Sequence, residues 1–204
     1  MYGTWNLFLE EIKRRASGQS SSENAQAAKA AIMILQICAF FHHSNISRDI
    51  FQSAAEKSRK KNIKSKVAKK LLLASTLLDY TLLPLDDDGY WDDFIFGQGI
   101  SILLYFSLIK REYSSGMYSI HPLLHCWSQE HMIKSEQQKM WELGGAILSC
   151  AIPWGFPSQC YAFQQLLFLH IKANELHGHQ MELMKQYYDD KYVNFAIVMG
   201  ENGD

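Results

Sequence analysis

The stretch LIKREYSSGMYSIHPLLHCW, residues 108–127, contains the signals that decide the fold. Two short runs of strand-forming residues flank the sequence Ser-Ser-Gly at 114–116, which is typical of a hairpin turn. These runs cover 108–113 and 117–120. His121 follows the second run directly, and Pro122 stands at the first position of a helical pattern, where proline is well tolerated. The stretch therefore predicts a β-hairpin that leads through a histidine into a helix.

The segments on both sides of this stretch carry the periodicity of helices. Trp5, Phe8, Leu9 and Ile12 follow the i, i+3, i+4, i+7 pattern of an amphipathic helix. We expect further helices at about 25–42, after an N-cap at Ser47, and at 67–83, 98–108, 122–132, 135–152, 158–176 and 179–199. Several helices followed by a hairpin and a further helix are the plan of a winged-helix domain. We therefore predict a mainly α protein, with a winged-helix domain carrying a β-hairpin wing at 1–132 and a helical extension at 133–204.

The composition is that of a globular chain without a membrane segment. The 204 residues are 48% hydrophobic and 20% charged with a net charge of −1, so nothing in the overall charge attracts nucleic acid or acidic lipid. The longest apolar run, 31–41, is too short to span a membrane, and the first residues lack the pattern of a signal peptide. The four cysteines contain no CxxC pair, which is typical of reduced thiols. We expect a cytoplasmic location.

Enzyme and metal chemistry find little support in the sequence. His121 and His125 are spaced like zinc ligands on a helix, but Pro122 stands where a metalloprotease needs its glutamate, and no third ligand is near. No GxSxG motif is present, and the acidic loop from Asp86 has Tyr and Trp at positions five and six, where an EF-hand needs other residues. We expect no metal and no catalytic activity. His121 can also act locally, by satisfying backbone groups at the start of the helix.

A basic run at 57–70 offers a nucleic-acid interpretation. It holds eight basic side chains among fourteen residues, and such side chains supply most non-specific affinity for phosphates. The wing itself contributes only Lys110 and Arg111, and a solvated linker that balances the acidic loop at 86–93 explains the run more simply. A winged-helix nucleic-acid binder is thus the alternative function. The chain has neither GxxxxGK[ST] nor GxGxxG, so it cannot bind a nucleotide through a P-loop of its own.

Three segments together resemble a known family: ILQICAFFHHSNISRDIFQSAAE (34–56), GISILLYFSLIKRE (99–112) and MYSIHPLLHCWSQEHM (117–132). They are similar to fungal NLR-like proteins, which are signal-transducing STAND ATPases with an NB-ARC nucleotide-binding module and kinesin-light-chain-type TPR repeats. The resemblance implies that this region is the winged helix that closes over the nucleotide. YSIHPLLHCW resembles the MHD motif, so His121 would contact the ADP phosphate, with Ile120 in place of the methionine and Pro122 in place of the aspartate.

The same resemblance implies a non-catalytic regulatory module that acts in signal transduction by protein–protein interaction. Its partners would be the NB-ARC ATPase module and the TPR repeats, and ADP or ATP would bind only together with that ATPase. YYDDKYVNFAIVMGENGD (187–204) resembles the first helix of a TPR-like pair, and a lone repeat cannot bury its apolar face. We therefore expect a part of a longer protein. Another possibility is a scaffold whose C-terminal helical face pairs with TPR helices of another copy (Tyr187, Tyr192, Phe195, Val198).

Overall fold

The computed structural model describes residues 2–18, 23–58, 82–152 and 161–180. In these ranges the protein has seven helices and one two-stranded antiparallel sheet, which confirms the prediction of a mainly α protein. In chain order the elements are α1 (Tyr2–Ala16), α2 (Glu23–Cys38), α3 (Arg48–Ser58), α5 (Phe94–Tyr105), β1 (Lys110–Arg111), β2 (Tyr118–Ser119), α6 (Pro122–Glu130), α7 (Lys134–Ala151) and α8 (Tyr161–Gln180). Residues 59–81, which include most of the basic run, and residues 181–204, which include the TPR-like segment, lie outside the described residues.

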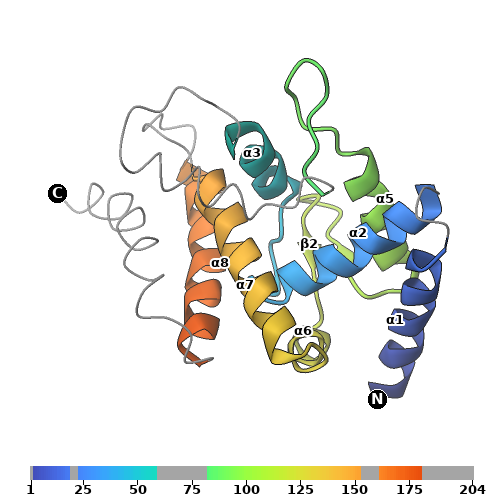
Figure 1. Ribbon diagram of the computed structural model, residues 1–204. Helices are drawn as coiled ribbons and strands as arrows, with labels where there is room; N and C mark the ends of the chain where they lie inside the picture. The colour runs from blue at the N-terminus through green and yellow to red at the C-terminus, as the bar shows by residue number, and fades with distance from the viewer. Residues whose placement is uncertain (1, 19–22, 59–81, 153–160, 181–204) are drawn as a thin grey trace.

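The helices form two groups on either side of the hairpin, as Figure 1 shows. In one group α2 packs against both α1 and α5, and in the other α7 packs against α3 and α8. α2 joins the groups, because its C-terminal part also contacts α6 and α7. None of the helices that the structure describes is long and apolar enough to cross a membrane.

The segment between α2 and α3 contributes a third short strand to the hairpin. Ile46 exchanges backbone hydrogen bonds with Tyr118 of β2, at 2.9 and 2.8 Å, in an antiparallel bridge. Ser47 follows at once, and its Oγ accepts a hydrogen bond from the N–H of Asp49 at 3.1 Å, which confirms the predicted helix cap. The predicted apolar side of α3 is fully buried (Ile50, Phe51, Ala54). α3 is therefore fixed at its start by both the hairpin and the cap.

The hairpin itself is shorter than the sequence predicts. Lys110 and Arg111 pair with Ser119 and Tyr118, and Gly116 closes the turn with a φ of 71° that favours glycine. Residues 108–109 do not pair, because the N–H of Leu108 donates to the carbonyl of Leu103 at 2.9 Å, and this bond continues the end of α5. Both are buried, so they belong to the core rather than to the wing.

Several helix boundaries also differ from the prediction, and two of them have a clear local cause. α2 ends at Cys38 rather than near residue 42, because the N–H groups of Phe40 and Phe41 bond to carbonyls three residues back and tighten the chain into a turn. α5 begins at Phe94 rather than near residue 98, since Oδ1 of Asp92 accepts a hydrogen bond from the N–H of Phe94 at 3.1 Å. The turn that follows Cys38 has consequences for the functional site, described below.

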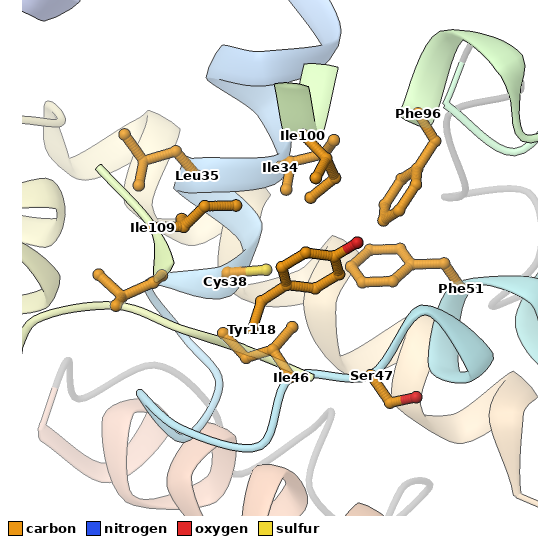
Figure 2. Close-up of a pocket in the computed structure, with 11 residues that line it drawn as sticks. Ile34, Leu35, Cys38, Ile46, Ser47, Phe51, Phe96, Ile100, Ile109 and Tyr118 are labelled. Atoms are coloured by element: carbon orange, nitrogen blue, oxygen red, sulfur yellow. The ribbon is translucent and has the colours of Figure 1, made fainter. Parts of the chain in front are cut away.

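A small apolar cavity lies between α2, α3, α5 and the hairpin (Figure 2). Its volume is about 10 Å³, which is the room of roughly one water molecule. The lining is almost entirely hydrophobic: Ile34, Leu35, Cys38, Ile46, Ser47, Phe51, Phe96, Ile100, Ile109, Tyr118 and Ile120. A space of this size cannot hold a nucleotide, so the cavity belongs to the packing of the core and not to a ligand site.

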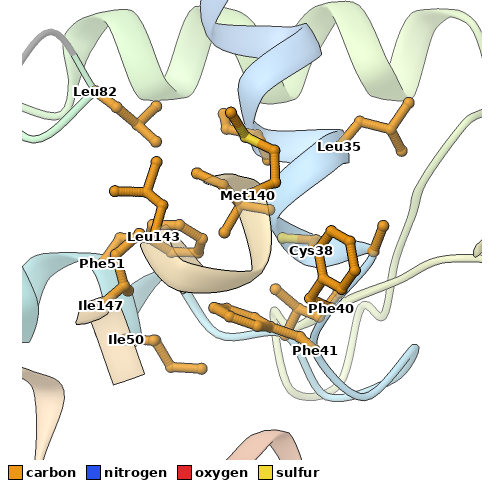
Figure 3. Packing of buried hydrophobic residues seen from close by; sticks show 14 of the residues in the cluster. Leu35, Cys38, Phe40, Phe41, Ile50, Phe51, Leu82, Met140, Leu143 and Ile147 are labelled. Atoms are coloured by element: carbon orange, nitrogen blue, oxygen red, sulfur yellow. The ribbon is translucent and has the colours of Figure 1, made fainter. Parts of the chain in front are cut away.

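The hydrophobic core extends across the domain boundary predicted at residues 132/133. Figure 3 shows Met140, Leu143 and Ile147 of α7 packed among Phe41 and Phe51, which come from the α2–α3 region. All five side chains are buried and belong to one cluster. The division into 1–132 and 133–204 stays a prediction, but in the described residues α7 shares its core with the segment before it.

Candidate functional site

The predicted joint between hairpin and helix forms as expected, and His121 lies at it. Its backbone is extended, with φ −60° and ψ 133°, and its Nδ1 accepts a hydrogen bond from the N–H of Leu123 at 3.2 Å. Pro122 occupies the first turn of α6, where a missing N–H costs nothing. His121 is therefore the N-cap of α6, which is the local role that the sequence left open.

The cap leaves one ring nitrogen of His121 available. The imidazole is exposed, and in the part of the chain that the structure describes its Nε2 has no hydrogen-bond partner. Because Nδ1 accepts a hydrogen bond, the proton of the neutral ring resides on Nε2, which can donate to an oxygen such as that of a phosphate. The capping role and a phosphate contact thus use different nitrogens of the same ring.

The strand end that carries His121 is held tightly. The N–H of Ile120 donates to the carbonyl of His43 at 2.7 Å, and the Ile120 side chain is buried in the core. Since β2 also pairs with Ile46, the backbone on the N-terminal side of His121 has bonds to the segment that follows α2. The position of the imidazole therefore depends on the turn at residues 39–46.

The carbonyls of that turn accept hydrogen bonds from side chains far away in the sequence. Gln129 of α6 donates through Nε2 to the carbonyl of Ala39, and Nε2 of His125 bonds to the carbonyl of Phe41 at 2.9 Å. From α8, Nδ2 of Asn174 donates to the carbonyl of Phe40 at 3.4 Å, and Nε2 of His170 bonds to the carbonyl of Asn45 at 3.0 Å. The end of α2 is thus capped by side chains of α6 and α8, which is why the helix stops earlier than its apolar pattern predicts.

These contacts determine the protonation of two buried histidines. A carbonyl only accepts, so Nε2 of both His125 and His170 carries a proton and donates. Burial lowers the pKa of His125 to about 4, although the hydrogen bond to Phe41 opposes this shift. Burial likewise lowers the pKa of His170 to about 4, against the effect of its bond to Asn45. Both rings are therefore neutral at physiological pH.

His121 and His125 have the spacing of zinc ligands on a helix, but the structure places them in different surroundings. His125 is buried and its Nε2 bonds to a carbonyl, whereas His121 is exposed and its Nδ1 caps the helix. Across the described ranges no group of three or more His, Cys, Asp or Glu side chains is arranged to hold a metal ion. The arrangement at the joint is one of hydrogen bonds to the backbone.

The other candidate residues have structural surroundings of their own. In the acidic loop, Oδ1 of Asp86 accepts hydrogen bonds from the N–H groups of Asp88 and Tyr90, so this carboxylate shapes the turn. Burial raises the pKa of the Cys38 and Cys150 thiols to about 12, which keeps them protonated and unreactive at neutral pH.

One residue of the basic run is described with its contacts. Nζ of Lys57 donates to the carbonyl of Ala151 at 3.0 Å, where α7 ends. A lysine at this position neutralises the negative end of the helix dipole. Lys57 therefore takes part in the packing of α3 against α7, and the nucleic-acid interpretation depends on residues 59–70, which lie outside the described residues.

The histidines and amides that surround the turn were not among the site residues predicted from the sequence. In α8 the residues His170, Asn174 and His177 lie at i, i+4 and i+7, and that spacing places them on one shared face. The pair His42-His43 directly after an apolar helix is a second signal of the same kind. Neither pattern reveals the partner, because the contacts join residues more than eighty positions apart.

Comparison with known proteins finds no matching family model, no matching curated protein and no matching solved structure.

Proposed function

We propose that this chain is a non-catalytic regulatory module of winged-helix type, which works with an NB-ARC ATPase module of the NLR-like class and senses ADP through His121. The observation that carries the proposal is the state of the His121 ring. Nδ1 is engaged in the helix cap and Nε2 is exposed at the end of a held strand, so the ring is oriented before any ligand arrives. Such preorganisation lowers the cost of binding a phosphate.

The order of the elements supports the winged-helix part of the proposal. The described chain runs in order through α2, the paired residue Ile46, α3, α5 and the hairpin. Ile46 adds a third short strand beside β2. α6 then leaves the hairpin at His121, where the resemblance assigns the sensor. In this scheme the helices after residue 133 connect the module to TPR-like repeats, and a change at the joint reaches them through the shared core.

ADP binding across two modules gives the scheme its switch. A ligand stabilises whichever arrangement it contacts better, so a phosphate held jointly by an ATPase module and His121 favours the closed arrangement. A charge-assisted hydrogen bond is worth about 1.5–3 kcal/mol, which corresponds to a change in ADP retention of about 10- to 100-fold. The chain alone has no P-loop motif, and we expect it to bind ADP poorly.

The test separates the sensor from the cap with two variants of His121. Asparagine is a good N-cap, so His121→Asn keeps α6 capped but removes the ring nitrogen that would reach a phosphate, whereas His121→Ala removes both. The native protein is first isolated by an antibody against α7, and its peptides are searched for a P-loop motif. ADP release is then measured with a fluorescent ADP analogue in the protein that carries the ATPase module.

We expect both variants to release ADP about 10- to 100-fold faster than the wild type, and only His121→Ala to lower the melting temperature. The matched control is His131→Ala, which changes another exposed histidine near the end of the same helix and should leave release unchanged. If His121→Asn released ADP at the wild-type rate, His121 would not be the sensor. If the isolated native protein contained no ATPase module, the proposed regulation of such a module would be refuted. Salt-sensitive binding to duplex DNA in that case would favour the nucleic-acid alternative.

A further inference from the structure

Five histidines meet where α8 packs against the end of α2 and α6. Following the ring centroids, His170 lies 6.5 Å from His42, His42 lies 4.5 Å from His43, His43 lies 6.3 Å from His125, and His125 lies 6.0 Å from His177. We call this group the histidine cluster. His42 and His43 belong to the turn after α2, His125 to α6, and the other two to α8. The cluster therefore spans the contact of α8 with α6 and with the turn after α2.

The surroundings of the cluster are unfavourable for positive charge. Neither His125 nor His170 has a carboxylate partner among the described residues, and each uses Nε2 on a backbone carbonyl. The groups that act electrostatically on His125 are His177 and His43, and the group that acts on His170 is His42. Each of these rings, once protonated, would repel a second proton. Lys172 and Glu175 of α8 form an ion pair with each other.

His170 is the most constrained member. Its side chain is fully buried, and its Nδ1 has no hydrogen-bond partner. Protonation at neutral or acidic pH must occur at Nδ1, because Nε2 already carries a proton for Asn45. A protonated Nδ1 would be a buried charged donor without an acceptor, which is among the most costly arrangements in a protein interior. Moving α8 away from the turn is the direct way to bring this nitrogen into water.

We propose that the histidine cluster is a pH-sensitive contact, which holds α8 against the turn after α2 at neutral pH and releases it when the solution becomes mildly acidic. Release breaks the bonds from His170 and Asn174 to the turn and the bond from the Trp141 indole N–H to the carbonyl of Asn174, which measures 2.7 Å. It also exposes the buried apolar side of α8, including Leu167. This inference does not depend on ADP sensing by His121.

The size of the effect follows from the two buried rings. Each has a pKa near 4 when α8 is packed and the ordinary 6.5 when it is exposed. Proton linkage then makes the released form about twentyfold more favourable at pH 5 than at pH 7 for each ring that release exposes. His170 contributes one such factor through its own exposure, and His125 contributes a second if water reaches it when α8 leaves.

Hydrogen–deuterium exchange of the full chain, followed by mass spectrometry, measures this release segment by segment. After correction for the pH dependence of intrinsic exchange, we expect the protection of α8 to fall at least about twentyfold between pH 7 and pH 5. Protection of α2 before its last turn, and of α5, should stay above that of α8 at both pH values, because these helices exchange only when the whole fold opens. Unchanged protection of α8 would overturn the proposal, and so would equal protection of all helices at pH 5, which would indicate that α8 opens only with global unfolding.

Two glutamine variants test the cluster itself. His170→Gln and His125→Gln keep an Nε2–H donor near the position of the ring nitrogen but cannot titrate, so the double variant should retain α8 protection at pH 5. His131→Gln, an exposed histidine at the end of α6, should keep the full wild-type loss. A double variant that loses protection as the wild type does would overturn the role of the cluster. If the double variant does not fold at pH 7, the wild-type exchange profile decides alone.

Discussion

Alanine substitutions at two glycines of α5 should have opposite effects on stability. A Cβ built on Gly99 lies 2.9 Å from the backbone N of Ala31 and 3.1 Å from the backbone C of Ala30, whereas nothing lies within 4 Å of a Cβ on Gly97. Gly99 is thus the point where α5 approaches the backbone of α2. Backbone atoms cannot turn aside as a flexible side chain does, so an added methyl group must push the two helices apart.

The magnitudes follow from these distances. Overpacking costs about 1–3 kcal/mol, and the better helix propensity of alanine returns about 1 kcal/mol at most. Because the contact is with backbone atoms at 2.9 Å, the cost lies in the upper part of this range, about 2–3 kcal/mol, and Gly99→Ala should lower the free energy of unfolding by about 1–2 kcal/mol. Gly97→Ala has no clash, so it should raise the free energy of unfolding by up to about 1 kcal/mol.

Urea unfolding followed by far-ultraviolet circular dichroism measures both variants against the wild type. The comparison within one helix cancels errors that are common to α5, such as its solvation in the unfolded chain. A Gly99→Ala protein as stable as Gly97→Ala would refute the reasoning, because it would mean that α2 and α5 do not approach each other closely at this residue.

Three further predictions concern the joint and its supports. The pKa values of His125 and His170 are lower in the folded protein than the ordinary 6.5, so the unfolded chain binds more protons between pH 4 and 6.5. The free energy of unfolding should therefore fall by about 2 kcal/mol from pH 7 to pH 5.5, as measured by urea titration. Lys57→Met removes the donor to the end of α7 and should cost about 1 kcal/mol in urea unfolding. Trp141→Phe leaves the buried carbonyl of Asn174 without its indole donor and should cost about 1–3 kcal/mol in the same assay.

Each of these has a result that contradicts it. Stability that is constant from pH 7 to 5.5 would mean that the two histidines are not buried as neutral rings. For Lys57, the control is Lys29→Met on the exposed side of α2, and equal effects of the two changes would exclude a specific contact with α7. For Trp141, wild-type stability of the phenylalanine variant would show that water satisfies the carbonyl as well as the indole does.

Local patterns predicted the elements of this fold well. The stripe from Trp5 to Ile12, the cap at Ser47 and the proline at the start of α6 each act within one or two turns of chain, and the structure has all three. The nature of these elements depends on neighbouring residues, so periodicity and cap residues are sufficient to predict them.

The end of α2 and the histidine cluster could not be predicted in the same way. The apolar run continues past Cys38, but the chain there tightens into a turn whose carbonyls, at Ala39, Phe40 and Phe41, accept hydrogen bonds from α6 and α8. A sequence pattern shows that a residue is polar on an apolar face, but it does not show which distant group it meets. The sequence therefore predicted one part of the candidate site, the joint at His121, but not the turn at residues 39–46 that supports it.

The capped turn after α2 also affects how the chain can fold during synthesis. Its hydrogen bonds join residues 84, 90, 125 and 134 positions apart, so the donors leave the ribosome long after the carbonyls that they satisfy. Domains form from the N-terminus as the chain emerges, but here the carbonyls after α2 lack these hydrogen-bond donors until α6 and then α8 have been synthesised. Closing such long loops is slow. While only the N-terminal half has been synthesised, its backbone carbonyls and apolar surface would be exposed to a chaperone. They would be covered once α8 has been synthesised and has packed.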